Sequence, residues 1–207
     1  MKDFVLKLIQ NGVVAVCEDL DEALEAQEYW ASAVLLVAER GGDLDSSSLM
    51  PSEEFLASAV SELKIPVFVR VRYWHFWEAE IVQSYWAAAI LESIKTDNSL
   101  EKVLNHWDFS IPIISEINSV EDFQKDQNNY LLLWEYATWN VIPLLEKLKE
   151  WKNKTNLNIF VGGGISNPAD IKLIKELWAV SGYFIWTALF DVYESRDYLK
   201  DVISYIK

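Results

Sequence analysis

Three consecutive glycines form the clearest candidate for a binding site in this sequence. An apolar run ends at Gly162, Gly163 and Gly164, and the pattern of a helix start follows at Ser166–Asp170. Backbone N–H groups in a glycine-rich turn can converge on an anion, and the positive end of the next helix supports the same charge. We therefore predict that Gly162, Gly163, Gly164 and Ser166 bind phosphate. A flexible turn without a ligand is the alternative.

Two arginines and one glutamate could carry out proton transfer or electrostatic stabilisation. Arg70 and Arg72 stand two residues apart in an apolar run, so in a strand both side chains point to the same face. Together they would place positive charge near a substrate carboxylate or phosphate. Glu116 ends an otherwise apolar run, and a buried carboxyl there suits general acid or base chemistry. We predict that Glu116 and Arg70 are catalytic and that Arg72 binds the substrate.

Other polar side chains follow further apolar runs, at Glu39, Glu92 and Asn140. We predict that these three residues bind the substrate. A salt bridge between neighbouring strands is the alternative for any one of the charged residues. Cys17 ends the first apolar run with no histidine nearby in the sequence, so we interpret it as a core thiol.

Eight short apolar runs, rich in β-branched residues, alternate with longer amphipathic stretches and would position these side chains. Each run is long enough for a strand that is buried on both faces. The runs are Val13–Cys17, Ala33–Ala38, Val67–Arg72, Ala88–Ser93, Ile111–Glu116, Tyr130–Glu135, Asn158–Gly162 and Gly182–Thr187. This alternation, without a break in composition, is typical of parallel βαβ units.

Helical patterns lie between the runs, for example at Ser52–Leu63 and Ile142–Trp151. Asn167 followed by Pro168 predicts a capped helix start. In the stretch that ends at position 151 we predict one buried stripe, which consists of Ile142, Leu145, Leu148 and Trp151.

Eight units in a chain of 207 residues predict an α/β fold, a single (β/α)8 TIM barrel that spans residues 1–207. A doubly wound open sheet is the alternative, but the regular units and the lack of a dinucleotide-binding fingerprint favour closure. In such barrels the loops after the seventh and eighth strands form the usual phosphate site. Trp186 and Thr187 end the eighth run, so we add both to the predicted phosphate-binding residues.

Composition excludes several classes of partner. The net charge of −14 lacks the Lys and Arg surplus that nucleic-acid binding needs, and it argues equally against a polybasic membrane-surface protein. One cysteine and two histidines argue against a zinc or histidine-rich metal centre. With no long apolar run and no signal-peptide pattern, we expect a cytoplasmic protein. We expect no cofactor or metal, a small phosphorylated substrate, and a homo-oligomer or a partner subunit.

Tryptophan is unusually frequent, with 10 Trp against 7 Gly, although glycine usually makes up about 7% of residues. Several of these tryptophans end helices, where a left-handed backbone favours glycine, or stand at strand ends: Trp30, Trp86, Trp178, Trp74, Trp139 and Trp186. We hypothesise that such positions are glycine in the functional protein, through a stop codon reassigned to glycine or through deliberate substitution. Ordinary packing of large side chains at the barrel rims is the alternative.

With glycine at the unusual tryptophans, most of the chain resembles indole-glycerol-phosphate synthase. The matching stretches are Tyr29–Val37, Gly41–Leu44, Ile65–Arg70, Ser84–Leu91, Ile113–Phe123, Gly164–Asp170 and Gly182–Phe190. This resemblance implies a carbon–carbon lyase of tryptophan biosynthesis, in which Glu116 is the family's fifth-strand glutamate and Arg70 replaces its third-strand lysine. Val16 and Glu18 stand where the family has glutamate and lysine on the first strand, and Gly162 and Gly163 replace its Glu-Ser pair.

A second resemblance is to the synthase subunit of pyridoxal phosphate synthase. It is carried by Ile65–Val67, Arg72–Ala79, Glu92–Ser93 and Trp134–Asn140, where that family has glycine at both tryptophans of the last stretch. The family's long insertion between the sixth and seventh strands is missing. Its first-strand aspartate and two Schiff-base lysines match Val16, Arg70 and Leu133 in this chain.

We therefore predict a phosphosugar enzyme that resembles indole-glycerol-phosphate synthase. The alternatives are a pyridoxal phosphate synthase-like subunit of vitamin B6 biosynthesis and a catalytically degenerate barrel that still binds a phosphorylated ligand.

Overall fold

A computed structural model of the protein describes residues 9–38, 50–72, 76–93, 111–117, 130–135, 140–151, 158–165, 167–177, 180–186 and 198–206. Several residues singled out in the sequence lie outside these ranges: Glu39, Trp74, Trp139, Ser166, Trp178 and Thr187. Arg72 lies within a strand, but its side chain is not described.

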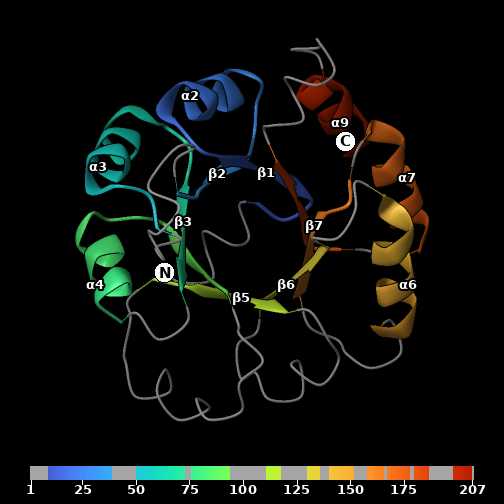
Figure 1. The fold of residues 1–207 in the computed structure, drawn as a ribbon. Coiled ribbons are helices and arrows are strands. Elements are labelled where there is room, and N and C mark those ends of the chain that lie inside the picture. Colours follow the sequence, from blue (N-terminus) through green and yellow to red (C-terminus); the bar gives the residue numbers. More distant parts are fainter. Residues whose placement is uncertain are drawn as a thin grey trace.

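Eight parallel strands close into one barrel in chain order (Figure 1). The strands are β1 (Gly12–Cys17), β2 (Ala33–Leu36), β3 (Val67–Arg72), β4 (Ala89–Ser93), β5 (Ile113–Ile117), β6 (Tyr130–Glu135), β7 (Asn158–Gly163) and β8 (Gly182–Trp186). Closure is seen at β1, where Val14 lies opposite Ala33 of β2 and also opposite Phe184 of β8. The predicted (β/α)8 barrel is confirmed, and the open-sheet alternative is wrong because β1 and β8 are hydrogen-bonded to each other.

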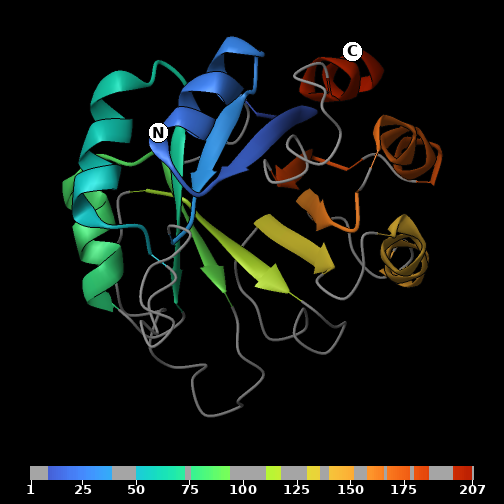
Figure 2. The ribbon, with the colours of Figure 1, turned by 45° about the horizontal axis from the view of Figure 1, so that its top comes forward.

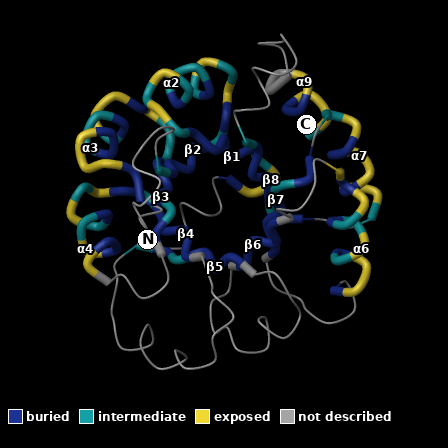
Figure 3. Tube along the Cα trace, in the orientation of Figure 1, coloured by how far each residue is buried: buried dark blue, intermediate teal, exposed yellow. Residues whose placement is uncertain are grey.

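Side chains on each strand alternate between the barrel interior and the surrounding helices, as the pleat of a strand requires. Val14 of β1 packs in the interior cluster with Phe184, and the Phe160 and Phe184 rings meet edge to face at 5.8 Å. Val13 packs in the outer cluster with helix residues such as Ala26. Figure 3 shows the result, with buried strands inside and exposed residues on the outer sides of the helices.

The helices lie outside the barrel (Figure 1). They are α2 (Leu20–Glu28), α3 (Glu53–Glu62), α4 (Phe76–Ser84), α6 (Val141–Trp151), α7 (Pro168–Leu177) and α9 (Tyr198–Ile206). In Figure 2 the arrowheads of β4, β5 and β6 point toward the same end of the barrel, as parallel strands joined by crossovers must. None of the helices in the described ranges has the length and apolar character needed to cross a membrane.

Observed strand bounds lie within two residues of the predicted runs, whereas one predicted helix face is confirmed at Leu148 and Trp151 and wrong at Ile142. In α6 the buried residues are Val141, Leu144, Leu148 and Trp151, and Ile142 is 56% exposed. A stripe on one face of an α-helix needs spacings of three and four residues, because a strict spacing of three drifts around the axis.

The start of α7 lies where the sequence predicts a capped helix. Asn167 precedes α7, Pro168 is its first residue, and the Asp170 carboxylate accepts a hydrogen bond from the Asn167 backbone N–H at 3.0 Å. This closes one half of a capping box, in which the third helical residue satisfies the backbone donor of the cap. The turn that follows the three glycines is thereby held against the start of α7.

Candidate functional site

The two predicted catalytic residues meet inside the barrel. Nη2 of Arg70, on β3, donates a hydrogen bond to Oε2 of Glu116, on β5, at 2.9 Å. The Arg70 side chain is 12% exposed and that of Glu116 is 2% exposed. The pair spans β4, which lies between the two strands in the sheet. The structure thus shows an ion pair between these residues, and their catalytic role stays a prediction.

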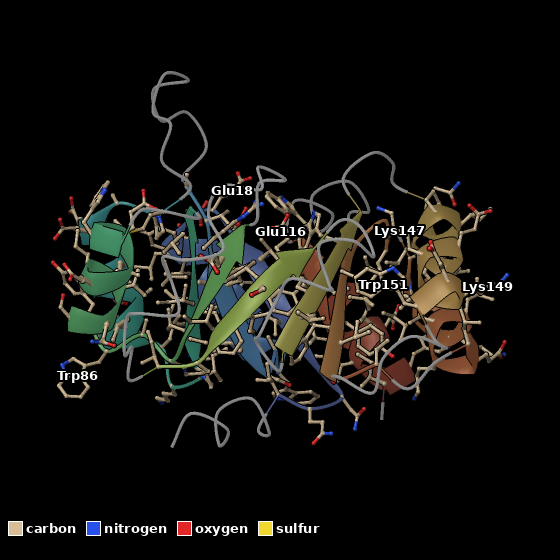
Figure 4. The ribbon with its side chains drawn as sticks, turned by 90° about the horizontal axis from the view of Figure 1, so that it is seen from below. Glu18, Trp86, Glu116, Lys147, Lys149 and Trp151 are labelled. Carbon is tan, nitrogen blue, oxygen red and sulfur yellow. The ribbon has the colours of Figure 1, made fainter. Side chains whose placement is uncertain are left out.

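This ion pair lies toward the carboxyl-terminal ends of its strands, where barrel enzymes place their chemistry. Glu18 follows β1 at the same end, and Figure 4 shows it nearer to that end of the barrel than Glu116. A guanidinium keeps its proton in proteins, so Arg70 can stabilise negative charge but not act as a proton donor. Glu116 is the member of the pair with proton-transfer chemistry.

Glu92 does not join the pair. It lies on the outward face of β4, the face that it shares with Ile90 of the outer cluster, and its register partner on β5 is Ser115. Both side chains are buried, between the barrel wall and the layer of helices. Contact of Glu92 with a substrate inside the barrel stays a prediction. The outward orientation of its side chain does not favour that contact.

Glu78, a fully buried carboxylate of α4, is not among the predicted site residues. Its neighbours on the buried face of this helix are Ala79 and Val82. A carboxylate that lies on the apolar face of an amphipathic helix is the signal that could have found it, because glutamate is almost never fully buried without an interaction.

The glycine turn after β7 has the geometry that glycine alone tolerates well. Gly163 and Gly164 both have positive φ, 65° and 63°. At Gly162 a Cβ atom would lie 2.5 Å from the ring of Trp134, so there is no room for any side chain. All three predicted phosphate-binding glycines are therefore required by the backbone or by packing, and phosphate binding itself stays a prediction.

Two indole rings occupy the barrel mouth beside this turn. Trp134, on β6, and Trp186, the last residue of β8, meet edge to face with their ring centroids 6.1 Å apart. Trp134 lies opposite Gly162 in register and packs in the interior cluster together with Trp186. The inner surface of Gly162, which a phosphate group would approach, is thus covered by the Trp134 ring.

Asn140 has a structural role in the described structure. It is exposed, directly precedes α6, and its side-chain oxygen accepts a hydrogen bond from the Ile142 backbone N–H at 3.0 Å. This is the usual contact of a helix N-cap. Contact of Asn140 with a substrate stays a prediction, as do the predictions for Arg72, Glu39, Ser166 and Thr187, whose side chains lie outside the described part.

Cys17 lies on the outer face of β1, fully buried in the outer cluster. Burial, followed by the nearby carboxylates of Glu22 and Asp19, raises the pKa of the Cys17 thiol well above its usual value. A neutral buried thiol is a poor nucleophile, which agrees with its interpretation as a core residue. Within the described ranges no group of three His, Cys, Asp or Glu side chains could hold a metal ion.

The glycine turn at the end of the seventh strand stands where (β/α)8 barrels frequently bind phosphate. The chain is 25% identical to the pyridoxal 5'-phosphate synthase subunit PdxS of Fusobacterium nucleatum, over 95% of this chain and 85% of that protein. It is 22% identical to PdxS of Saccharolobus islandicus, over 94% of this chain and 70% of that protein. No protein-family model matches the chain.

These comparisons and the fold support a place in the ribulose-phosphate-binding barrel superfamily. A third relative is PdxS of Corynebacterium diphtheriae, which is 20% identical over 88% of this chain and 75% of that protein. Because these three relatives are PdxS subunits, they favour the resemblance to pyridoxal phosphate synthase over the resemblance to indole-glycerol-phosphate synthase.

Proposed function

We propose that this protein is a PdxS-like barrel subunit that binds a pentose phosphate at the carboxyl-terminal mouth of its barrel. The observation that carries the proposal is similarity to PdxS subunits along nearly the whole chain, not along the glycine turn alone. The positive φ of Gly163 and Gly164 supports it, because this backbone is what a phosphate-binding turn after the seventh strand requires. PdxS is named as a subunit, so we propose a partner subunit or a homo-oligomer here as well.

This chain differs from the family that it resembles at the residues that would form a covalent bond with the substrate. The positions that match the two Schiff-base lysines hold Arg70 and Leu133. A guanidinium does not form the imine that an amine forms with a sugar carbonyl, and Leu133 is buried on the outer face of β6. We therefore propose that pentose phosphate binds reversibly, with Arg70 and Glu116 facing the sugar end of the ligand and no imine at these two positions.

Pentose phosphate binding tests this function. The ligand should bind weakly or not at all to the tryptophan-bearing chain, because Trp134 covers Gly162 and Trp186 packs against it. A Trp134→Gly/Trp186→Gly variant should bind it at least tenfold more tightly in calorimetry. The matched control is Trp30→Gly/Trp86→Gly, which removes two indoles from helix ends outside the barrel and should leave the affinity unchanged.

Two further readouts separate the proposal from its competitors. Borohydride reduction in the presence of pentose phosphate should leave the protein mass unchanged, whereas a covalent adduct would overturn reversible binding. Fluorescence would report indole-ring closure on carboxyphenylamino-deoxyribulose phosphate, and turnover would overturn the PdxS-like proposal in favour of an indole-glycerol-phosphate synthase. No pentose phosphate binding by the Trp134→Gly/Trp186→Gly variant would overturn the proposed function.

A further inference from the structure

We propose that positions 30 and 86 are glycine positions and that the working protein carries glycine, not tryptophan, at both. The backbone at the ends of α2 and α4 supports this assignment.

The two helix ends have the same hydrogen-bonded geometry. After α2 the Trp30 N–H donates to the Gln27 carbonyl at 3.1 Å, and the Ala31 N–H donates to the Ala26 carbonyl at 3.0 Å. After α4 the Trp86 N–H donates to Gln83 at 3.0 Å, and the Ala87 N–H donates to Val82 at 3.3 Å. These paired bonds define a Schellman motif, in which the residue that carries the tryptophan here is left-handed and is most often glycine.

Both tryptophans adopt that left-handed backbone, with φ of 66° at Trp30 and 64° at Trp86. A bulky side chain with positive φ is a genuine outlier, because its Cβ crowds the following carbonyl oxygen. Packing does not compensate for this strain, since Trp30 is 69% exposed and Trp86 is 87% exposed. Figure 4 shows the Trp86 ring projecting away from the protein. The backbone thus requires glycine at both positions, and the indoles contribute no buried core.

Residue identity in the native protein tests the assignment directly. Peptide mass spectrometry of the protein purified from its own organism should show glycine at positions 30 and 86. Position 151 is the internal control, because Trp151 is 2% exposed, lies within α6 and packs in the outer core, so it should be tryptophan. Tryptophan at position 30 or 86, or glycine at 151, would overturn the link between backbone geometry and residue identity.

Recombinant variants test the backbone argument without the native source. Trp30→Gly and Trp86→Gly should each raise the urea midpoint of unfolding. Trp30→Ala removes the same ring but keeps the Cβ, so it should give a smaller rise. Trp77→Gly removes an exposed ring from within α4 and should give no rise. A lower midpoint for Trp30→Gly and Trp86→Gly, or an equal rise for Trp30→Ala, would overturn the argument, whatever the outcome of the pentose phosphate measurements.

Discussion

Arg70 and Glu116 are two charges removed from water and held 2.9 Å apart inside a barrel of apolar side chains. Their mutual attraction has to offset the desolvation of both ions, so a buried pair adds little net stability compared with two well-packed apolar residues. Loss of one member of the pair is destabilising, because the other charge remains buried without this partner. The pair is thus better understood as a site that the fold maintains than as a source of stability.

A double-mutant cycle at this pair tests that interpretation. Arg70→Met alone should lower the free energy of unfolding by about 3 kcal/mol, since Glu116 is then a buried carboxylate without its arginine. The Arg70→Met/Glu116→Leu double variant should be clearly more stable than the single variant. Urea denaturation of the four proteins in the cycle measures both quantities. Additive costs for the two substitutions would contradict the coupling that the geometry implies.

Secondary-structure elements are fixed at both ends by hydrogen bonds to otherwise unpaired backbone groups. At the start of α2 the Asp19 carboxylate accepts from the Glu22 N–H at 2.8 Å, and the Glu22 carboxylate accepts from the Glu18 N–H at 2.8 Å. At the end of α2 the Schellman bonds satisfy the last carbonyls, with the strained Trp30 between them. The start of this helix therefore agrees with its sequence, whereas its end conflicts with it.

The N-cap of α2 gives a prediction at this scale. Asp19→Ala should lower the free energy of unfolding by about 1 kcal/mol, because the Glu22 N–H loses its acceptor. Asp19→Asn keeps an oxygen acceptor and should recover most of that loss. Thermal or urea unfolding measures the difference between the two variants. Equal stability of the Ala and Asn variants would show that the cap bond does not stabilise α2.

At the scale of the whole molecule, stability depends on the pairing of β1 with β8, which joins residues far apart in the chain. Lys175 of α7 also links elements near this seam, since its ammonium donates to the Tyr205 and Ile206 carbonyls at the end of α9, at 3.1 and 3.0 Å. Tyr183 lies on β8, buried on the outer face of the barrel. Its burial raises the pKa of the Tyr183 hydroxyl to about 12.

This shift predicts how the stability of the barrel changes in alkali. The unfolded chain has a tyrosine pKa of about 10, so between these values the unfolded state loses the proton that the folded state keeps. The contribution of Tyr183 is fully present below pH of about 10 and is lost as the pH rises toward 12. Unfolding free energies measured across this range should fall with pH, and Tyr183→Phe should reduce the slope. An unchanged slope in the variant would contradict the assignment to Tyr183.

The sequence by itself determined the eight strands, the helix start at Asn167 and the need for glycine at the end of β7. These are local properties, set by periodicity of apolar residues and by backbone conformation within a few positions. Left-handed backbone at Trp30 and Trp86 also followed from local signals, because the residue just past a helix commonly adopts it.

Only the tertiary structure decided which side chains meet. Glu116 and Glu92 looked alike in the sequence, each near the end of an apolar run, yet Glu116 faces Arg70 inside the barrel and Glu92 faces outward. The register in which β1 pairs with β8 and the Trp134–Trp186 contact were equally undetermined. The physical reason is that the register between strands and the packing of helices on them join residues far apart in the chain, and no local pattern records those pairings.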